Sequence, residues 1–270
     1  KATTKQIHEV FNLYNKQGKH LNAEEIRNAV FHSLDMMKAL IVCSGDNPFV
    51  DDTAPFLAAS WSSLNRISET LDEFKFGTAR YRRSKVLSWV IATLVCDSRN
   101  SETGEVAIKS TAMQIEGLLK RIDENPRDKL REQSRILSLM ELVADGFSFH
   151  SAVPEAWDPK FMDTGSGTKW QELQLIGSLV GVVLATAVLG DEVEDLLVTK
   201  AAELRAISRQ SWLRPKKTQS RSQWIHIAKV SMGILDGLEI DPVQASNHLE
   251  QNYGQSGVHV LTALKDESLS

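Results

Sequence analysis

The sequence predicts an all-α protein built as a multi-helix bundle. Apolar residues recur three and four positions apart in one segment after another, which is the period of an amphipathic helix. No segment alternates apolar and polar residues convincingly at period two, so we expect little strand. The chain has 270 residues, of which 42% are hydrophobic and 24% charged, and this is enough for one or two globular domains with a packed core.

The first helices follow from caps and turn residues. Apolar residues at helical spacing predict a helix over residues 4–15, which the turn around Gly18 ends. Asn22, followed three residues later by Glu25, has the pattern of a capping box. We therefore expect a second helix to begin at Asn22 and to keep one apolar face as far as Ile41.

The middle of the chain alternates loops and helices. Residues 44–48 concentrate turn-forming residues, and Asn125-Pro126 has the signature of a cap followed by the first residue of a helix. We expect Gly146 to end the helix that this signature opens. The helices expected in this region cover residues 56–64, 81–95, 106–122 and 126–144.

Residues 147–168 contain two prolines and a Gly-Ser-Gly turn, and they predict an irregular connection. This connection is the best internal boundary of the chain. It separates a helical region of residues 1–146 from a C-terminal helical region of residues 169–270, and we expect the two to pack as one domain. The C-terminal region should hold a fully buried helix over residues 170–189 and further helices that begin near Asp191, Ser220 and Asp241.

Composition excludes several classes of protein. The formal net charge of −4 is not that of a nucleic-acid-binding protein, so such a role must rest on local clusters. Cys43 and Cys96 sit in apolar runs and indicate buried thiols in a reducing, cytoplasmic compartment. The uncharged stretch of residues 173–189 is shorter than the ~20 residues that span a bilayer, so we expect a core helix and no membrane contact. The first residue is Lys, which leads us to expect a piece of a longer protein.

The most informative stretch of the sequence covers residues 11–29. It reads Phe, three residues, Asn15, then Gly18, the pair Leu21-Asn22, an acidic residue, and Arg27 followed by Asn28. This stretch resembles the second signature of the ParB/sulfiredoxin-like domain of GmrSD-type modification-dependent restriction systems. The resemblance is at the level of motifs over roughly the first hundred residues, and at the level of helix pattern beyond them.

In that family the domain is described as a nucleotide hydrolase, whose catalytic loop of the Asp-Gly-Gln-Gln-Arg type precedes this signature. Neither that loop nor the His pair of an HNH nuclease occurs in the chain. The resemblance therefore implies the helical C-terminal portion of an anti-phage restriction protein, without a complete active site or a cofactor of its own. The complete protein would use a nucleoside triphosphate with Mg²⁺. This portion would support a catalytic half, supplied by the missing N-terminal part or by a partner subunit, and could form a homo-oligomer.

Two interpretations of the signature stay open. In the functional one, a helix N-terminus with neighbouring donors binds an anion, and a nucleotide pocket is formed by Asn15, Lys19, Asn22 and Arg27. In the structural one, Gly18 makes a turn, Asn22 caps a helix, and Arg27 lies on the solvated face of that helix.

A second cluster is basic. Seven basic residues and no acidic residue occur between Leu204 and Leu235, interleaved with Trp212 and Trp224. Such a composition suits a phosphate backbone, and the residues predicted to contact DNA are Arg205, Arg209, Arg214, Lys216, Lys217 and Arg221. The alternative is that acids elsewhere, such as those of residues 191–195, neutralise the cluster.

A smaller basic group opens the helix over residues 81–95, and it comprises Arg80, Arg82, Arg83 and Lys85. Cations at a helix N-terminus oppose the helix dipole, so an anion or the acids of residues 69–73 should compensate them. No histidine or carboxylate spacing indicates a metal site. The first functional hypothesis is thus a nucleotide-responsive restriction protein, and the alternative is a helical protein–protein interaction scaffold without a nucleotide or DNA role.

Overall fold

The structure is a computed structural model, and it describes residues 21–100, 102–108, 110–157, 170–211 and 220–268. The regular structure of these residues is helical, and besides the helices there is one isolated antiparallel bridge between Arg99 and Val106. The predicted all-α fold class is confirmed. The predicted helix over residues 4–15 lies outside the described residues.

The longest helices are α8 to α11, which have 18 to 20 residues each. The α-helices are α2 (Ala23–Phe31), α3 (Asp35–Cys43), α4 (Val50–Thr53), α5 (Trp61–Glu73), α6 (Arg82–Val95), α7 (Thr111–Glu124), α8 (Gln133–Ala152), α9 (Glu172–Leu189), α10 (Glu192–Ser211), α11 (Ser220–Gly237), α12 (Pro242–Tyr253) and α13 (Val258–Leu264). Short 3₁₀ segments are η1 (Pro55–Ser60), η2 (Ala79–Tyr81), η3 (Lys129–Arg131) and η4 (Pro154–Ala156).

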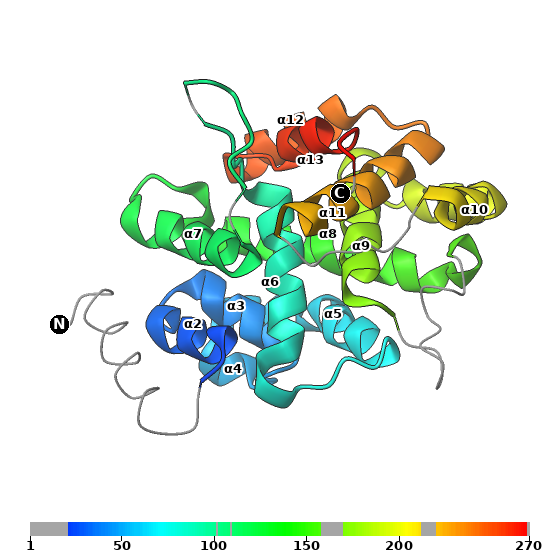
Figure 1. The fold of residues 1–270 in the computed structure, drawn as a ribbon. Coiled ribbons are helices and arrows are strands. Elements are labelled where there is room, and N and C mark those ends of the chain that lie inside the picture. Colours follow the sequence, from blue (N-terminus) through cyan, green and yellow to red (C-terminus); the bar gives the residue numbers. More distant parts are fainter. Residues whose placement is uncertain (1–20, 101, 109, 158–169, 212–219, 269–270) are drawn as a thin grey trace.

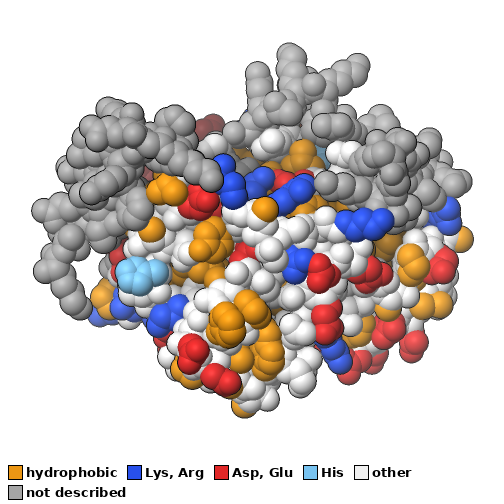
Figure 2. Space-filling view, turned by 90° about the horizontal axis from the view of Figure 1, so that it is seen from below, with side chains coloured by type: hydrophobic (Ala, Val, Ile, Leu, Met, Phe, Trp, Pro, Cys, Tyr) orange, Lys and Arg blue, Asp and Glu red, His pale blue; other side chains and the backbone are white. Residues whose placement is uncertain are grey.

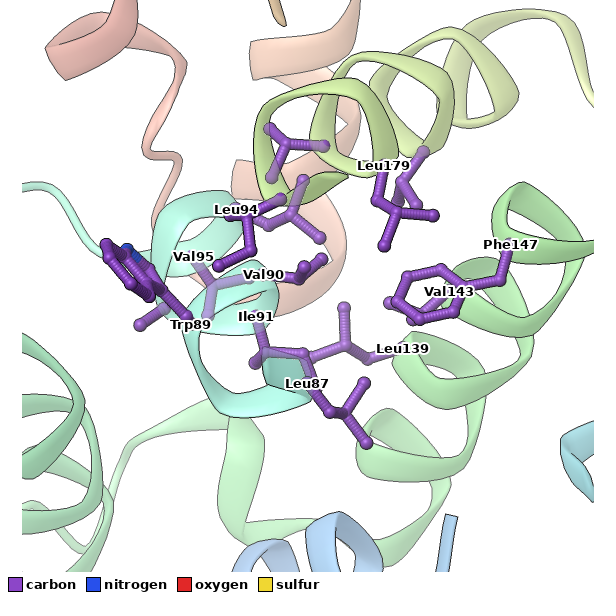
Figure 3. Packing of buried hydrophobic residues seen from close by; sticks show 14 of the residues in the cluster. Leu87, Trp89, Val90, Ile91, Leu94, Val95, Leu139, Val143, Phe147 and Leu179 are labelled. Atoms are coloured by element: carbon purple, nitrogen blue, oxygen red, sulfur yellow. The ribbon is translucent and has the colours of Figure 1, made fainter. Parts of the chain in front are cut away.

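Helices α6 and α9 run through the middle of the molecule, with α2 to α5 around the start of α6 and α12 and α13 at its other end (Figure 1). Helix α9 packs against α6, α8 and α11. In Figure 3, Leu87 and Ile91 of α6 point toward α8, which contributes Leu139, Val143 and Phe147 to the same cluster. One cluster of buried side chains draws on both the 1–146 region and the 169–270 region.

Helix α9 is buried along almost its whole length, as the sequence predicts. By length and composition it is the one helix in the described ranges that could cross a membrane, and 78% of its apolar window is buried inside the protein.

Cys43 and Cys96 are free thiols. Burial raises the pKa of Cys43 to about 12 and that of Cys96 to about 11. Both therefore stay protonated at neutral pH, in keeping with their prediction as small hydrophobic residues.

Two helix boundaries in the first half differ from those predicted. The single helix expected from Asn22 to Ile41 is two helices, because the chain bends before Leu34, which has extended backbone angles. Helix α3 buries nearly all of its side chains. If α3 simply continued α2, only the one apolar face shared with α2 would be buried, so the side chains on its other faces would stay exposed. The short helix predicted over residues 56–64 is η1 followed by α5, which continues to Glu73.

Further differences concern the helices around Gly146. The helix predicted over residues 106–122 begins at Thr111. The helix predicted over residues 126–144 begins only at Gln133 and passes through Gly146 to Ala152. A Cβ atom at Gly146 would lie 2.9 Å from the Cα of Val183, so this glycine brings α8 close to α9 and does not end the helix. The irregular connection therefore begins after Ala152, later than predicted, and residues 158–169 of it lie outside the described residues.

Predictions in the C-terminal half are closer to the structure. Helix α10 carries acidic residues in its first turn, and Asp241 caps α12 by accepting a hydrogen bond from the backbone N–H of Val243 at 2.9 Å. Helix α11 begins at Ser220, as expected. Helix α13 follows α12, in a tail whose apolar pattern is weak.

Candidate functional site: a pocket at the start of α2 and α6

A pocket of about 400 Å³ lies where three helices approach one another. The start of α2 contributes its cap Asn22 together with Ala23 and Glu24. The 3₁₀ turn η2 contributes Ala79 and Arg80, and the first turn of α6 contributes Arg82 and Lys85. Helix α7 contributes Ala112 and Ile115. Figure 2 shows the side of the molecule at which α6 begins, where Lys and Arg side chains gather in a band with acidic side chains beside them. The pocket combines cations, two helix N-termini and an apolar wall.

The start of α2 is fixed by the capping box that the sequence predicts. The backbone N–H of Glu25 donates to Oδ1 of Asn22 at 2.8 Å, and the backbone N–H of Asn22 donates to Oε2 of Glu25 at 2.7 Å. The side-chain amide of Asn22 donates to the carbonyl oxygen of Arg80 at 3.0 Å. The cap thus also links α2 to the turn before α6, which is 58 residues away in sequence.

The turn before α6 has an uncommon backbone. Arg80 and Tyr81 are consecutive non-glycine residues with φ of 57° and 60°. Left-handed angles cost free energy in such residues, so surrounding contacts must hold them. The Arg80 guanidinium contacts the Glu25 carboxylate at 2.8 Å, and its carbonyl accepts from Asn22. Arg80 in this turn and Arg82 directly after it both line the pocket.

The first turn of α6 contains no acidic residue. Asp46, from the loop after α3, instead accepts a hydrogen bond from the backbone N–H of Ser84 at 2.8 Å and another from the Ser84 hydroxyl. Burial raises the pKa of Asp46 above its ordinary value, although the hydrogen bonds from Ser84 oppose the rise. The side chain of Asp46 thus caps α6 from another part of the chain.

The cations at the start of α6 differ in how they are compensated. Arg83 pairs with Asp72, one of the acids that the sequence suggests for this role, and Lys85 pairs with Glu172 of α9. The Arg82 guanidinium lies 5.0 Å from the centre of the Phe76 ring. Among the described residues, no carboxylate lies within ion-pair distance of Arg82. Arg82 is therefore the pocket cation most available to an anionic ligand.

Arg27 does not line this pocket. Its side chain is buried, forms an ion pair with Glu24, and donates to the carbonyl oxygen of Ala112 at 3.3 Å. The prediction that Arg27 lies on a solvated helix face is wrong, because the docking of α7 over α2 covers it. Of the four residues predicted to bind a nucleotide, the structure places Asn22 at the pocket, and Asn15 and Lys19 lie outside the described residues.

The basic segment is only partly described. Arg221 forms an ion pair with Glu267 at 2.6 Å, so the acid that neutralises it comes from the end of the chain and not from residues 191–195. Arg205 is half-buried, and Trp224 is buried in the core, 6.5 Å from the ring of Trp89. Arg214, Lys216, Lys217 and the side chain of Arg209 lie outside the described residues.

Within the described ranges no group of three His, Cys, Asp or Glu residues could hold a metal ion. The sequence singles out both Asn22 and the Arg80–Lys85 group, but nothing in it indicates that they share a pocket, because hydrogen bonds between distant residues bring them together.

No protein-family model, curated protein or solved structure matches the chain. The pocket must therefore be interpreted from its own chemistry.

Proposed function

We propose that this chain is the helical portion of a nucleotide-responsive anti-phage restriction protein of prokaryotes, and that the pocket between α2, α6 and α7 binds the nucleotide. The observation that carries this proposal is the meeting of two helix N-termini with Arg82 and Lys85 in one pocket. Helix N-termini and cationic side chains both favour phosphate groups. The sequence resemblance of residues 11–29 points to the same class of ligand.

The volume of the pocket suits a mononucleotide. Ligand pockets usually measure about 300–1,000 Å³, so 400 Å³ accommodates a small ligand rather than a polymer. The phosphates would lie against Arg82 and the first turn of α6, and the base or sugar against Ala112 and Ile115 of α7. The other half of the protein would supply the catalytic loop, together with Mg²⁺ on the triphosphate. The second role of this chain would be to support that half.

Replacing Arg82 by alanine is expected to weaken nucleotide binding about tenfold or more, since a charge-assisted contact to phosphate is lost. Isothermal titration of the chain with ATP and with GTP measures this effect. Arg66→Ala is the matched control, because Arg66 is an exposed arginine of α5 that does not line the pocket. Its affinity should equal that of the unchanged chain.

Equal effects of the two substitutions, or no binding of either nucleotide, would refute the pocket as a nucleotide site. The alternative function, a protein–protein interaction scaffold, would then be favoured. In the described ranges, no cluster of exposed apolar residues favours that alternative now. The large exposed apolar side chains of the described residues lie on different elements, and they are Phe49, Met113, Val198 and Val243. On the face shown in Figure 2, hydrophobic side chains form separate groups.

We also propose DNA contact through the basic segment, on the strength of its composition. Changing Lys216 and Lys217 to glutamate should weaken binding to duplex DNA and flatten its dependence on salt. The slope of log K against log salt is negative, and each lost phosphate contact reduces its magnitude by about 0.9. Fluorescence anisotropy at several salt concentrations measures both quantities. Unchanged affinity and slope in the double variant would exclude these residues from a DNA interface.

A further inference from the structure

A second pocket, of about 210 Å³, lies on a different part of the molecule and has a different chemistry. It forms where α5 and α8 end, next to η4 and to Trp170, which lies two residues before α9. Its walls include the aromatic side chains of Phe74, Trp157 and Trp170, together with Glu73, His150 and Ser151. No residue of the nucleotide pocket takes part in it.

The aromatic rings of this pocket form a single cluster around His150. The His150 ring stacks on Trp157 with 4.4 Å between ring centres and 11° between planes. Phe74 stands edge-on to His150 at 5.5 Å and to Trp170 at 5.6 Å. Trp157 and Trp170 are almost completely buried, so their orientations are set by packing. Aromatic rings carry negative potential on their faces, and a preorganised group of them attracts cations.

The electrostatics of the pocket point in the same direction. Glu73 is the last residue of α5, and α8 ends at Ala152, so the pocket lies at the C-termini of two helices, where the helix dipoles favour positive charge. The Glu73 carboxylate accepts a hydrogen bond from the Ser151 hydroxyl. Among the described residues that line the pocket, none is Lys or Arg. The Glu73 carboxylate, the dipoles of α5 and α8 and the aromatic rings therefore favour a cation, and none of the described lining side chains supplies one.

His150 does not supply that positive charge. It is fully buried, and burial lowers its pKa to about 3, so the ring is neutral at physiological pH. The Ser178 hydroxyl donates to the carbonyl oxygen of Leu175 at 3.0 Å, which leaves Nε2 of His150 to donate to the Ser178 oxygen at 2.8 Å. The proton is thus on Nε2, and Nδ1 is a buried acceptor with no hydrogen-bond partner in the described structure.

We propose that this pocket binds a small organic ammonium ion, with the alkyl group against Phe74, Trp157 and Trp170 and the ammonium group near the carboxylate of Glu73. A primary ammonium carries three N–H donors, and Glu73 and the carbonyl groups at the ends of α5 and α8 are acceptors. The volume of about 210 Å³ is below the usual range for drug-sized ligands and suits a short aliphatic amine. An anion of the same size would be repelled by the carboxylate of Glu73, the one charged side chain among the described lining residues.

The test uses n-butylammonium, n-butanol and butyrate, three probes of similar size whose charges are positive, zero and negative. The chain is labelled with 5-fluorotryptophan, and the ¹⁹F signals of Trp157 and Trp170 are assigned from Trp157→Phe and Trp170→Phe. We expect butylammonium to shift these two signals at millimolar concentrations, and butanol and butyrate to leave them unchanged. Equal shifts with all three probes, or none with butylammonium, would overturn the proposal.

The Glu73→Gln variant separates a cation site from a merely apolar cavity. Its affinity for butylammonium should fall about tenfold, because the main charge partner is lost while the aromatic walls remain. Glu155→Gln is the matched control, since Glu155 is an exposed acid on η4 outside the pocket lining. It should change the affinity by less than about twofold, as a screened surface charge does. Equal losses in the two variants would show only a general effect of net charge and would refute the site.

Discussion

Replacing Gly257 by alanine lowers the free energy of unfolding by about 3 kcal/mol or more, which is the cost of overpacking a site that cannot relax. Gly257 lies just before α13, and its backbone N–H donates to the carbonyl oxygen of Leu94, near the end of α6, at 2.7 Å. A Cβ atom there would overlap the carbonyl oxygen of Thr93 and lie 2.9 Å from its carbonyl carbon. Both atoms belong to the backbone of a buried helix, so α13 would have to move away from α6.

Urea unfolding followed by far-UV circular dichroism measures this loss. Gly117→Ala is the control, because Gly117 lies inside α7 and a Cβ atom there would meet nothing within 4 Å. Alanine in that helical position should be neutral or raise stability by up to about 1 kcal/mol. If the Gly257 variant unfolded at the same urea concentration as the unchanged chain, the close contact between α6 and α13 would be disproved.

The elements that could be predicted from the sequence are those that local chemistry determines. The capping box of Asn22 and Glu25 and the Asp241 cap involve residues two or three positions apart, and each starts its helix where expected. The long apolar run of α9 likewise needs no partner to be identified as a buried helix. In these segments the pattern of the sequence and the packing of the protein favour the same conformation.

Boundaries that depend on distant residues could not be predicted in this way. Gly146 looks like a helix terminator in sequence, yet it lies inside α8 because Val183 of α9 packs against it. The break between α2 and α3 marks the change from the one-sided burial of α2 to the nearly complete burial of α3, which depends on the helices packed around α3. Asp46 caps α6 from 38 residues away in sequence, so a search for a neighbouring cap cannot find it.

The same limit applies to the candidate sites. Asn22 was a candidate on local grounds, but its neighbours Arg80 and Arg82 join it only through the fold. The cluster of Phe74, His150 and two tryptophans joins the end of α5 to residues 150–170, and single aromatic residues give no sign in sequence that they will meet. The sequence shows where basic residues and helix N-termini occur along the chain. Only the structure shows which of these residues and N-termini line a pocket.

Replacing Arg27 by alanine is expected to lower the free energy of unfolding by about 3–5 kcal/mol, which is the usual cost of removing one member of a buried ion pair. The side chains of Arg27 and Glu24 are 3% and 10% exposed, so Glu24 would keep a buried charge without its partner. The contact from Arg27 to the carbonyl oxygen of Ala112, which holds α7 against α2, would also be lost. Thermal and urea unfolding measure the effect.

A double variant tests the physical cause of this loss. Changing Arg27 to methionine and Glu24 to glutamine removes both charges together, so the double variant should recover a large part of the stability lost in Arg27→Ala. Recovery identifies the unpaired charge of Glu24 as the main cost. A double variant as unstable as the single one would instead assign the cost to lost packing and to the lost contact with Ala112.

The Arg27 variant also decides between the two interpretations of the signature. Because Arg27 does not line the pocket, Arg27→Ala should still bind ATP at temperatures where it is folded, weakened only by the unpaired charge that it leaves on Glu24 in the pocket wall, whereas Arg82→Ala should lose affinity and keep its stability. This pair of results would assign the signature arginine to the support of α2 and α7, and phosphate binding to the start of α6. The reverse pair, with a stable Arg27→Ala that no longer binds ATP, would place Arg27 at the ligand and contradict the buried ion pair with Glu24.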